Sequence, residues 1–437
     1  MKFSINKYGK KIYSLAKSIF YINRSITGNG VRKTLQQLKE ILPNLKVYEI
    51  KSKKKVFDWS IPLEWNIKSA YIKKGNKIIL DFKKHNLHVV GYSQKIKKTL
   101  KLNELKKKIH FIKNLPNAIP YVVSYYKKDW GFCMPFNKYK KLKKGNYKVL
   151  IDSTTKIGSL TYADLLIKGK SDKEILLSTY TCHPSMGNNE TSGVCLVTYL
   201  AEYLNELNKN KKLNFSYRIV FHPENIGAIT YINQNIKKLK KNVIAGYVVT
   251  CVGDNGNYLY IKSKEEQSLS NRAAINILKN NYNNYKLYEF IKGGSDERRY
   301  NAPGINLPVG SLMRSKYGEY KEYHTSMDNL EYISEKGFQK SFEIYIQILT
   351  LLENNLKYKI KTICEPQLGK RNLYPLVSKW PDPEKFKKLE NLLDFMSYAD
   401  GENDLISIAD KLGVSGLDLI NVVEKLKKEK LLDYKLR

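Results

Sequence analysis

Four residues in the second half of the chain have the types and positions needed for hydrolytic chemistry. His183, Glu224 and Asp254 each come shortly after an apolar segment, and His324 lies just before a long amphipathic one. Imidazole nitrogens and carboxylate oxygens are zinc ligands, and a carboxylate can also act as a general base. If the apolar segments are parallel strands, their carboxyl ends share one edge of a sheet, and that edge is where ligands bind in open α/β sheets.

Each of these residues also has a simpler interpretation. A single histidine in a turn is more often structural than a ligand. Glu224 could have no role beyond stabilising a helix N-terminus through the helix dipole. Asp254 stands before Asn and Gly, a setting typical of a turn former. His183, however, is followed closely by Asn189 and Glu190, which add oxygen donors to the same turn. The coincidence of several polar strand ends favours a shared site.

The hydrophobic pattern from residue 175 onward predicts alternating strands and helices, which indicates an α/β fold with a parallel sheet. A long N-terminal helix that contains "SITGNG" is expected to pack on this sheet. The predicted strands are 175–181, 215–222, 244–251, 287–291 and 306–312, and the predicted helices are 10–40, 194–207, 226–239, 267–280 and 334–354.

Two segments with different residue patterns interrupt this alternation. Residues 46–150 contain short apolar runs broken by Gly, Pro and Lys, which predicts a β-rich insertion. Residues 378–437 read as three short helices with a terminal apolar run, which predicts a winged-helix domain. Residues 1–45 and 151–377 then form the α/β domain.

The charge of the chain does not by itself indicate nucleic-acid binding. The net charge is +36, but only nine of the 77 basic residues are Arg and the Lys residues are spread along the sequence. Arg clusters and a basic face are the usual marks of a nucleic-acid interface. Compositional bias is the favoured explanation, although the charge should still favour acidic partners.

The remaining composition favours a protein of the cytoplasm. The five Cys show no C-x-x-C spacing and no compact disulfide framework, and no run approaches the roughly 20 apolar residues of a membrane span. The N-terminus lacks a continuous apolar core and a cleavage site, so we expect it to be an amphipathic helix. An oligomer is compatible with the sequence.

Longer motifs resemble a known group of proteins. "HPSM", "NNETSG", "PENIG", "SDERRY" and "YHTSMDNL" resemble the marks of the co-catalytic zinc exopeptidases of the leucyl aminopeptidase and glutamate carboxypeptidase type. "LPVGSLMRSKYGEYKEYHTS" and "EPQLGKRNLYP" are similar to segments of bacterial aminopeptidase-like proteins with a β insertion and a C-terminal winged helix. The resemblance implies a zinc-exopeptidase-like (phosphorylase/hydrolase-like) sheet and a link to surface-polysaccharide biosynthesis.

The resemblance also implies a site. His183 and His324 would hold zinc with help from Glu190 or Asn189, Asp254 would be a displaced ligand, and Glu224 would be the general base. One zinc ion is favoured over two, because Asn189 stands where these enzymes carry a bridging Asp and Asn is a poorer ligand.

Three further residues complete the expected site. Arg298 and Arg314, two of the few Arg residues, could bind a substrate carboxylate in bidentate fashion, although a structural ion pair is slightly favoured for each residue taken alone. Tyr323 is the third substrate-binding candidate.

Three functions compete on this sequence. The first is zinc-dependent, aminopeptidase-like hydrolysis of an amide in a peptide or an acylated amino sugar. The second is a catalytically degenerate fold that binds such a molecule, which Asn189 and Asn225 in place of carboxylates would favour. The third is a regulator that uses the winged helix. The expected recognition segment has no Arg, so we expect this domain to contact a protein rather than a specific DNA sequence.

Overall fold

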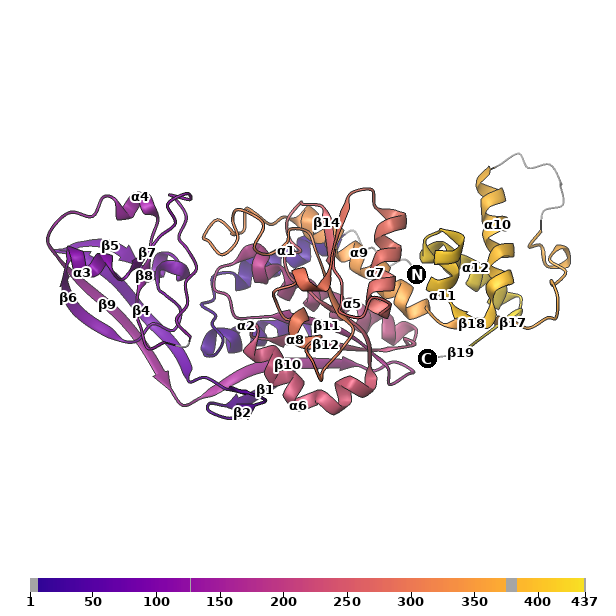
Figure 1. Cartoon of the computed structure of the whole chain (residues 1–437), viewed down its shortest axis with the longest axis horizontal. Helices are drawn as coiled ribbons and strands as arrows, with labels where there is room; N and C mark the ends of the chain where they lie inside the picture. Colours follow the sequence, from indigo (N-terminus) through magenta and orange to yellow (C-terminus); the bar gives the residue numbers. More distant parts are fainter. Residues whose placement is uncertain (1–6, 126, 375–382, 436–437) are drawn as a thin grey trace.

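The computed structural model describes residues 7–125, 127–374 and 383–435. A β-rich insertion, a central α/β unit and a C-terminal winged helix follow one another along the longest axis of the molecule (Figure 1). The α/β fold, the β-rich insertion and the winged helix predicted from the sequence are therefore confirmed. No helix in the described ranges is long and apolar enough to cross a membrane.

The central unit is built on an eight-stranded sheet. Four neighbouring strands of this sheet, β12, β11, β13 and β16, run parallel, so their carboxyl ends meet at one edge. In spatial order the strands are β1 (Lys46–Lys51), β10 (Ser159–Ile167), β12 (Ser216–His222), β11 (Glu174–Tyr180), β13 (Val243–Val248), β16 (Val309–Met313), β14 (Tyr258–Ile261) and β15 (Tyr285–Tyr288).

Helices cover both faces of this sheet. Their buried apolar residues form one core cluster on each face, as expected for an α/β layer structure. One face carries α1 (Tyr8–Ile19), α2 (Asn29–Ile41), α5 (Gly193–Asn210), α7 (Leu269–Asn281) and α9 (Glu335–Asn354). The other carries α6 (Ile226–Asn242) and the short α8 (Glu297–Tyr300). The predicted helices from residue 194 onward agree with these bounds to within a few residues.

The N-terminal region departs from the prediction, because two helices replace the single helix expected over 10–40. Gly28 breaks the helix with φ +98°, a conformation that favours glycine. A Cβ on Gly28 would also lie 2.2 Å from the Trp65 carbonyl oxygen. The loop 20–28 between the helices passes next to the candidate site described below.

The insertion begins later than predicted. Lys46–Lys51, which the prediction placed in it, forms β1 and pairs with β10 of the central sheet. The chain leaves the central unit at Ser52 and returns at Gly158, where the Ser52 N–H donates to the Gly158 carbonyl at 2.9 Å. This close pairing of entry and exit gives the insertion a narrow connection.

The insertion contains a second sheet with its own apolar core. That sheet has the order β5 (Lys77–Asp81), β4 (Glu64–Lys74), β9 (Asn146–Lys156) and β6 (Ile96–Lys101). The short elements around it are β2 (Lys55–Val56), β3 (Trp59–Ser60), α3 (Leu102–Lys106), β7 (Ile109–His110), β8 (Phe132–Cys133) and α4 (Phe136–Tyr139).

The winged helix begins before residue 378, since the strand β17 (Lys357–Ile360) pairs with both later strands. Its other elements are α10 (Pro383–Tyr398), β18 (Asp400–Asp404), α11 (Leu405–Leu412), α12 (Gly416–Lys428) and β19 (Leu432–Lys435). Arg272 of α7 forms two hydrogen bonds with Asp404, at 2.6 and 3.0 Å, and Asn276 accepts the N–H of Gly416 at 2.8 Å. These contacts fix the N-terminal ends of α11 and α12 against the α/β unit.

Candidate active site

His183 lies three residues beyond the end of β11, at the parallel edge of the sheet, and its side chain is only 4% exposed. Glu190 orients it: one carboxylate oxygen lies 3.1 Å from His183 Nδ1 and also accepts the backbone N–H groups of Cys182 and His183. Burial opposes protonation of His183, but the Glu190 hydrogen bond and charge outweigh it and raise the pKa of the imidazole. With Nδ1 engaged, Nε2 is the nitrogen available to a ligand.

Arg24 completes the support of His183 from the loop between α1 and α2. Its Nε donates to Glu190 at 2.8 Å and to the His183 carbonyl oxygen at 3.1 Å, while Nη2 donates to Thr191 at 2.9 Å. The side chains of Arg24 and Glu190 are both 0% exposed. A buried ion pair of this kind is strongly destabilising to break, so it fixes the His183 turn.

Glu224 follows β12 and faces His183 from the next strand. One of its oxygens lies 3.7 Å from His183 Nε2, and the other accepts the Ser295 hydroxyl at 2.5 Å. Burial, together with the charges of Glu297 and Glu190, raises the pKa of Glu224 against the opposing effects of His183 and Ser295. A carboxylate with a raised pKa next to an imidazole is suited to proton transfer.

His324 closes the site from the loop before α9. Its ring centroid lies 5.2 Å from that of His183, and its Nε2 is buried without a hydrogen-bond partner among the described residues. Burial and the nearby His183 lower the pKa of His324 to about 3, so the ring is neutral and available as a ligand.

Backbone strain is concentrated around this site. Ser185, Asn225, Cys251 and His324 all have φ between +50° and +59°, although none is glycine. Left-handed backbone at such residues costs about 1–3 kcal/mol each and tends to occur at functional sites. All four lie in the loops that follow the parallel strands or precede α9, so strained backbone is part of this site.

The spacing of the two histidine rings agrees with a zinc ion bound by both. Two imidazoles bound to one tetrahedral zinc at about 2 Å would have ring centroids about 5 Å apart, close to the 5.2 Å found here. The unpartnered Nε2 of His324 is also unusual for a buried polar atom. A different group, Cys182 with His183 and Glu190, brings ligand atoms within 4.8 Å, but Arg24 and backbone N–H groups already occupy the Glu190 oxygens.

The other predicted oxygen ligands are engaged in internal hydrogen bonds. The Asn189 amide oxygen accepts the Tyr180 hydroxyl at 2.7 Å. The Asp254 carboxylate accepts hydrogen bonds from the Asn188 side-chain amide at 2.8 Å and from the Ser315 hydroxyl at 2.9 Å, and so supports the turn before α5. The carboxylates of Asp254 and Glu190 thus both accept internal hydrogen bonds, whereas the Asn189 oxygen keeps a second lone pair.

The structure separates the three predicted substrate-binding residues. The Tyr323 ring stacks on His324 with centroids 3.9 Å apart, so it lies at the site. Arg298 is exposed and donates to the Gly293 carbonyl within its own loop. Its neighbour Arg299 instead donates to Asn225 at 2.7 Å. Arg314 is buried over the ring of Tyr258, away from the two histidines in the fold, and its Nη2 donates to the Gly256 carbonyl oxygen.

Two residues at the site were missed by the sequence reasoning, Arg24 and Tyr121. Arg24 carried a weak signal as one of the few Arg residues, but its segment read as helix. Tyr121, from the insertion, has its ring centroid 5.1 Å from both histidine rings, and its N–H donates to the His324 carbonyl at 2.9 Å. No local pattern marks such a contact, because it joins segments about 60 and 200 residues apart.

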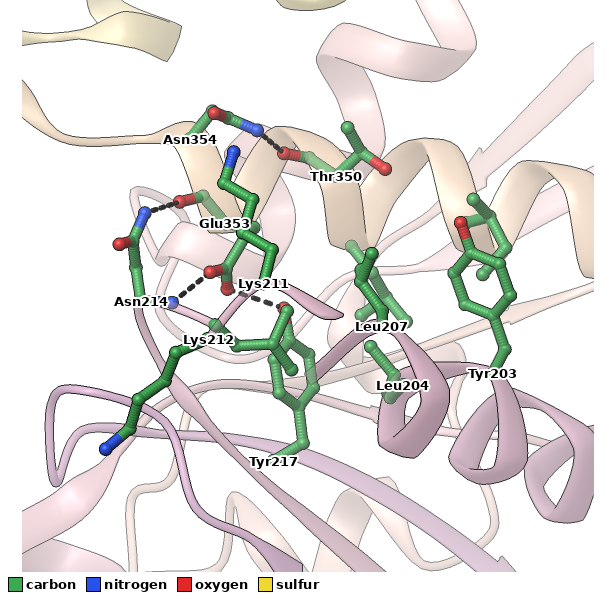
Figure 2. Close-up of a pocket in the computed structure, with 13 residues that line it drawn as sticks. Tyr203, Leu204, Leu207, Lys211, Lys212, Asn214, Tyr217, Thr350, Glu353 and Asn354 are labelled. Carbon is green, nitrogen blue, oxygen red and sulfur yellow. Dashed lines mark hydrogen bonds between the residues drawn. The ribbon is translucent and has the colours of Figure 1, made fainter. Parts of the chain in front are cut away.

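A cavity of about 130 Å³ lies away from this site, between the C-terminal ends of α5 and α9 (Figure 2). Glu353 points into it and accepts the Asn214 backbone N–H and the Tyr217 hydroxyl (Figure 2). Burial raises the pKa of Glu353 to about 7. Because no residue of the candidate active site lines this cavity, Glu353 bears on stability rather than on the chemistry at His183.

The fold and its loops define the class of this protein as an aminopeptidase-like α/β domain joined to a winged helix. The chain belongs to the family described as domain of unknown function DUF4910, whose model matches residues 13–355. A winged helix-turn-helix model matches residues 356–434.

Named relatives agree with this assignment. A Clostridium acetobutylicum protein described as a candidate polysaccharide biosynthesis protein with an aminopeptidase-like domain is 45% identical over 94% of each chain. A crystal structure of a candidate peptidase from the same organism matches with a TM-score of 0.91 and 42% identity, over 99% of this chain and 98% of that one. A zinc aminopeptidase from Bacillus subtilis shares the fold at a TM-score of 0.56 and 12% identity, over 79% of this chain and 94% of that one.

Proposed function

We propose that this protein is a metal-dependent amide hydrolase that holds a single zinc ion between His183 and His324. The observation that carries the proposal is the buried, unpartnered Nε2 of His324, whose ring faces His183 at 5.2 Å. The Asn189 amide oxygen is a neutral third donor. The absence of a bridging carboxylate at position 189 favours one ion, because two cations close together need an anionic ligand between them.

Zinc, when bound, would polarise the scissile carbonyl and make a nearby water molecule more acidic. Glu224 accepts a proton from the attacking water as the new carbon–oxygen bond forms, and donates it to the amine nitrogen as the carbon–nitrogen bond breaks. Ser295 holds the other Glu224 oxygen, which keeps the carboxylate facing His183. Tyr121 covers both imidazoles and limits the access of bulk water.

The proposed substrate is a peptide or an acylated amino sugar, and the proposed context is glycan assembly in the cytoplasm. The name of the Clostridium acetobutylicum relative supports this context. A binding protein without chemistry is the second candidate, which is favoured by the internal hydrogen bonds of Glu190 and Asp254 and by Asn at positions 189 and 225.

Elemental analysis of protein purified without a chelator or a His-rich tag tests the proposal. We expect about one zinc per chain in the wild type and in Glu224→Gln, and almost none in His183→Ala. Glu224→Gln should reduce the hydrolysis of aminoacyl anilides or N-acetylated amino sugars by about 100-fold or more, because an amide cannot accept the proton. Ser171→Ala, far from the site, serves as the purification control.

The outcomes separate the two candidate functions. Two zinc ions per chain, or unchanged zinc in His183→Ala, would show that the site is misassigned. Zinc at one ion per chain with no hydrolysis of either substrate class would favour the binding protein.

A further inference from the structure

A larger cleft lies beside the candidate active site, between the insertion and the α/β unit. Its volume is about 460 Å³, which is within the usual range for small-molecule sites. The hairpin β2–β3 forms one wall with Trp59, the insertion contributes Tyr92 and Tyr125, and Ile226 at the start of α6 contributes the wall nearest the sheet. Two of the three walls therefore come from the insertion.

The cleft is cationic. Lys53, Lys127 and Lys128 line it, all three are exposed, and none forms an ion pair with a described residue. No Asp or Glu is among the lining residues. Lysine binds phosphate and carboxylate groups as a compact point charge, so this cleft is complementary to an anion.

The remaining lining combines aromatic faces with neutral hydrogen-bonding groups. Trp59 is partly exposed and offers an aromatic surface, Tyr92 is only 7% exposed and adds a small part of its ring, and Gln94, Ser124 and Thr155 offer amide and hydroxyl groups. A pyranose ring has the matching character, because its C–H faces are apolar and its edges carry hydroxyl groups. A long peptide would instead need paired backbone donors and acceptors along an extended groove.

One side-chain contact and one sequence neighbour place the cleft next to the candidate active site. The Tyr125 hydroxyl lies 3.0 Å from that of Tyr121, whose ring covers both His183 and His324. Ile226 stands two residues after Glu224. The tyrosine pair therefore connects the cleft to the two histidines.

We propose that the cleft binds the part of the substrate remote from the scissile amide, and that this part is a sugar carrying a phosphate or a carboxylate group. The proposal rests on the proposed function in assigning the cleft to a substrate. The anionic sugar binds whether or not the amide is hydrolysed. The insertion then has a defined role, since it supplies the rings and the lysines.

Isothermal titration calorimetry tests this binding with three probes: N-acetylglucosamine 1-phosphate, galacturonic acid and neutral N-acetylglucosamine. We expect at least one anionic sugar to bind at least 10-fold more tightly than the neutral sugar, and its affinity to fall as NaCl is raised from 50 to 500 mM. The two anionic probes distinguish a phosphate from a carboxylate ligand. Binding of none of the probes at 10 mM, or equal binding of all three, would overturn the proposal.

Variants locate the binding within the cleft. The double variant Lys127→Gln/Lys128→Gln should lower the affinity for the anionic sugar at least 5-fold. The control Lys143→Gln/Lys144→Gln, with the same charge change elsewhere in the insertion, should keep the wild-type affinity. Trp59→Ala should weaken charged and neutral sugars alike. Equal losses in both lysine pairs would show only a general charge effect and would refute the cleft assignment.

The same titration in Glu224→Gln and in His183→Ala separates this inference from the proposed function. If sugar binding persists in both variants while the wild type holds no zinc and hydrolyses neither substrate class, the cleft assignment stands and the hydrolase is rejected. If the wild type binds zinc and hydrolyses a substrate but shows no preference for the anionic sugar, the hydrolase stands and the cleft assignment is rejected.

Discussion

Removing the Arg24 guanidinium should destabilise the protein far more than removing an exposed charge. Arg24→Met keeps much of the side-chain volume but leaves the Glu190 carboxylate buried without its cation, since both side chains are 0% exposed. Breaking such a pair costs about 3–5 kcal/mol. Arg24→Met also loses the hydrogen bonds to Thr191 and to the carbonyl oxygens of Ile19 and His183.

Urea unfolding followed by circular dichroism measures this loss. The matched control is Lys108→Met, which removes a surface partner of Asp129 and should cost less than about 1 kcal/mol. In the double variant Arg24→Met/Glu190→Gln no uncompensated charge remains, so its loss should be at least about 1 kcal/mol smaller than the sum of the two single losses.

Arg24→Met should also weaken zinc binding about 10–100-fold, because groups that orient a metal-binding histidine commonly have effects of that size. A competition assay with a chromogenic chelator measures this affinity. If Arg24→Met loses less than 1 kcal/mol of stability and keeps wild-type zinc affinity, the role assigned to the Arg24–Glu190 pair is wrong.

Three further predictions follow from other parts of the molecule. The pKa of Glu353 is raised from 4.5 to about 7, so its protonation stabilises the fold fully below pH 4.5 and this contribution is lost as pH rises through 7. Glu353→Gln, which mimics the protonated acid, should match the wild type at about pH 4 and exceed its stability by up to about 3 kcal/mol at pH 8 in urea titrations, whereas a constant difference would refute the shift. Replacing residues 53–157 by a short Gly-Ser linker between the hydrogen-bonded ends Ser52 and Gly158 should leave a folded, less stable α/β core by circular dichroism, and complete unfolding would show that the insertion belongs to that core. The full chain should bind DNA only weakly and without sequence preference, because the N-terminal end of α12 is buried against α7, and nanomolar, sequence-selective binding at physiological salt would contradict this.

Part of the fold followed directly from local patterns. The strands β11, β12 and β13 and the helices α5, α6 and α9 were predicted to within a few residues, because each is a long apolar or amphipathic segment. β10 and β14 were not predicted. β10 pairs with β1 and β12 to join the first part of the chain to the sheet, a long-range pairing that its own sequence does not specify.

The candidate site divides in the same way. The sequence determined which groups end the parallel strands, and so His183 and Glu224 were identified by type, by position and by the motifs around them. Which of the neighbouring oxygens stay free was decided by hydrogen bonds that only the folded chain makes. The sequence predicted Glu190 as a ligand, and only the folded chain shows that Arg24, 166 residues earlier, donates a hydrogen bond to its carboxylate.

For this protein, then, the sequence determined the α/β class, the insertion, the winged helix and the histidines and glutamate at the sheet edge, because these depend on periodicity and on local motifs. Tertiary structure alone decided that Arg24 fixes the His183 turn, that Tyr121 covers both imidazoles and that the insertion forms a cationic cleft beside them. The physical reason is that burial and ion pairing depend on neighbours in space, and those neighbours come from segments far apart in the chain.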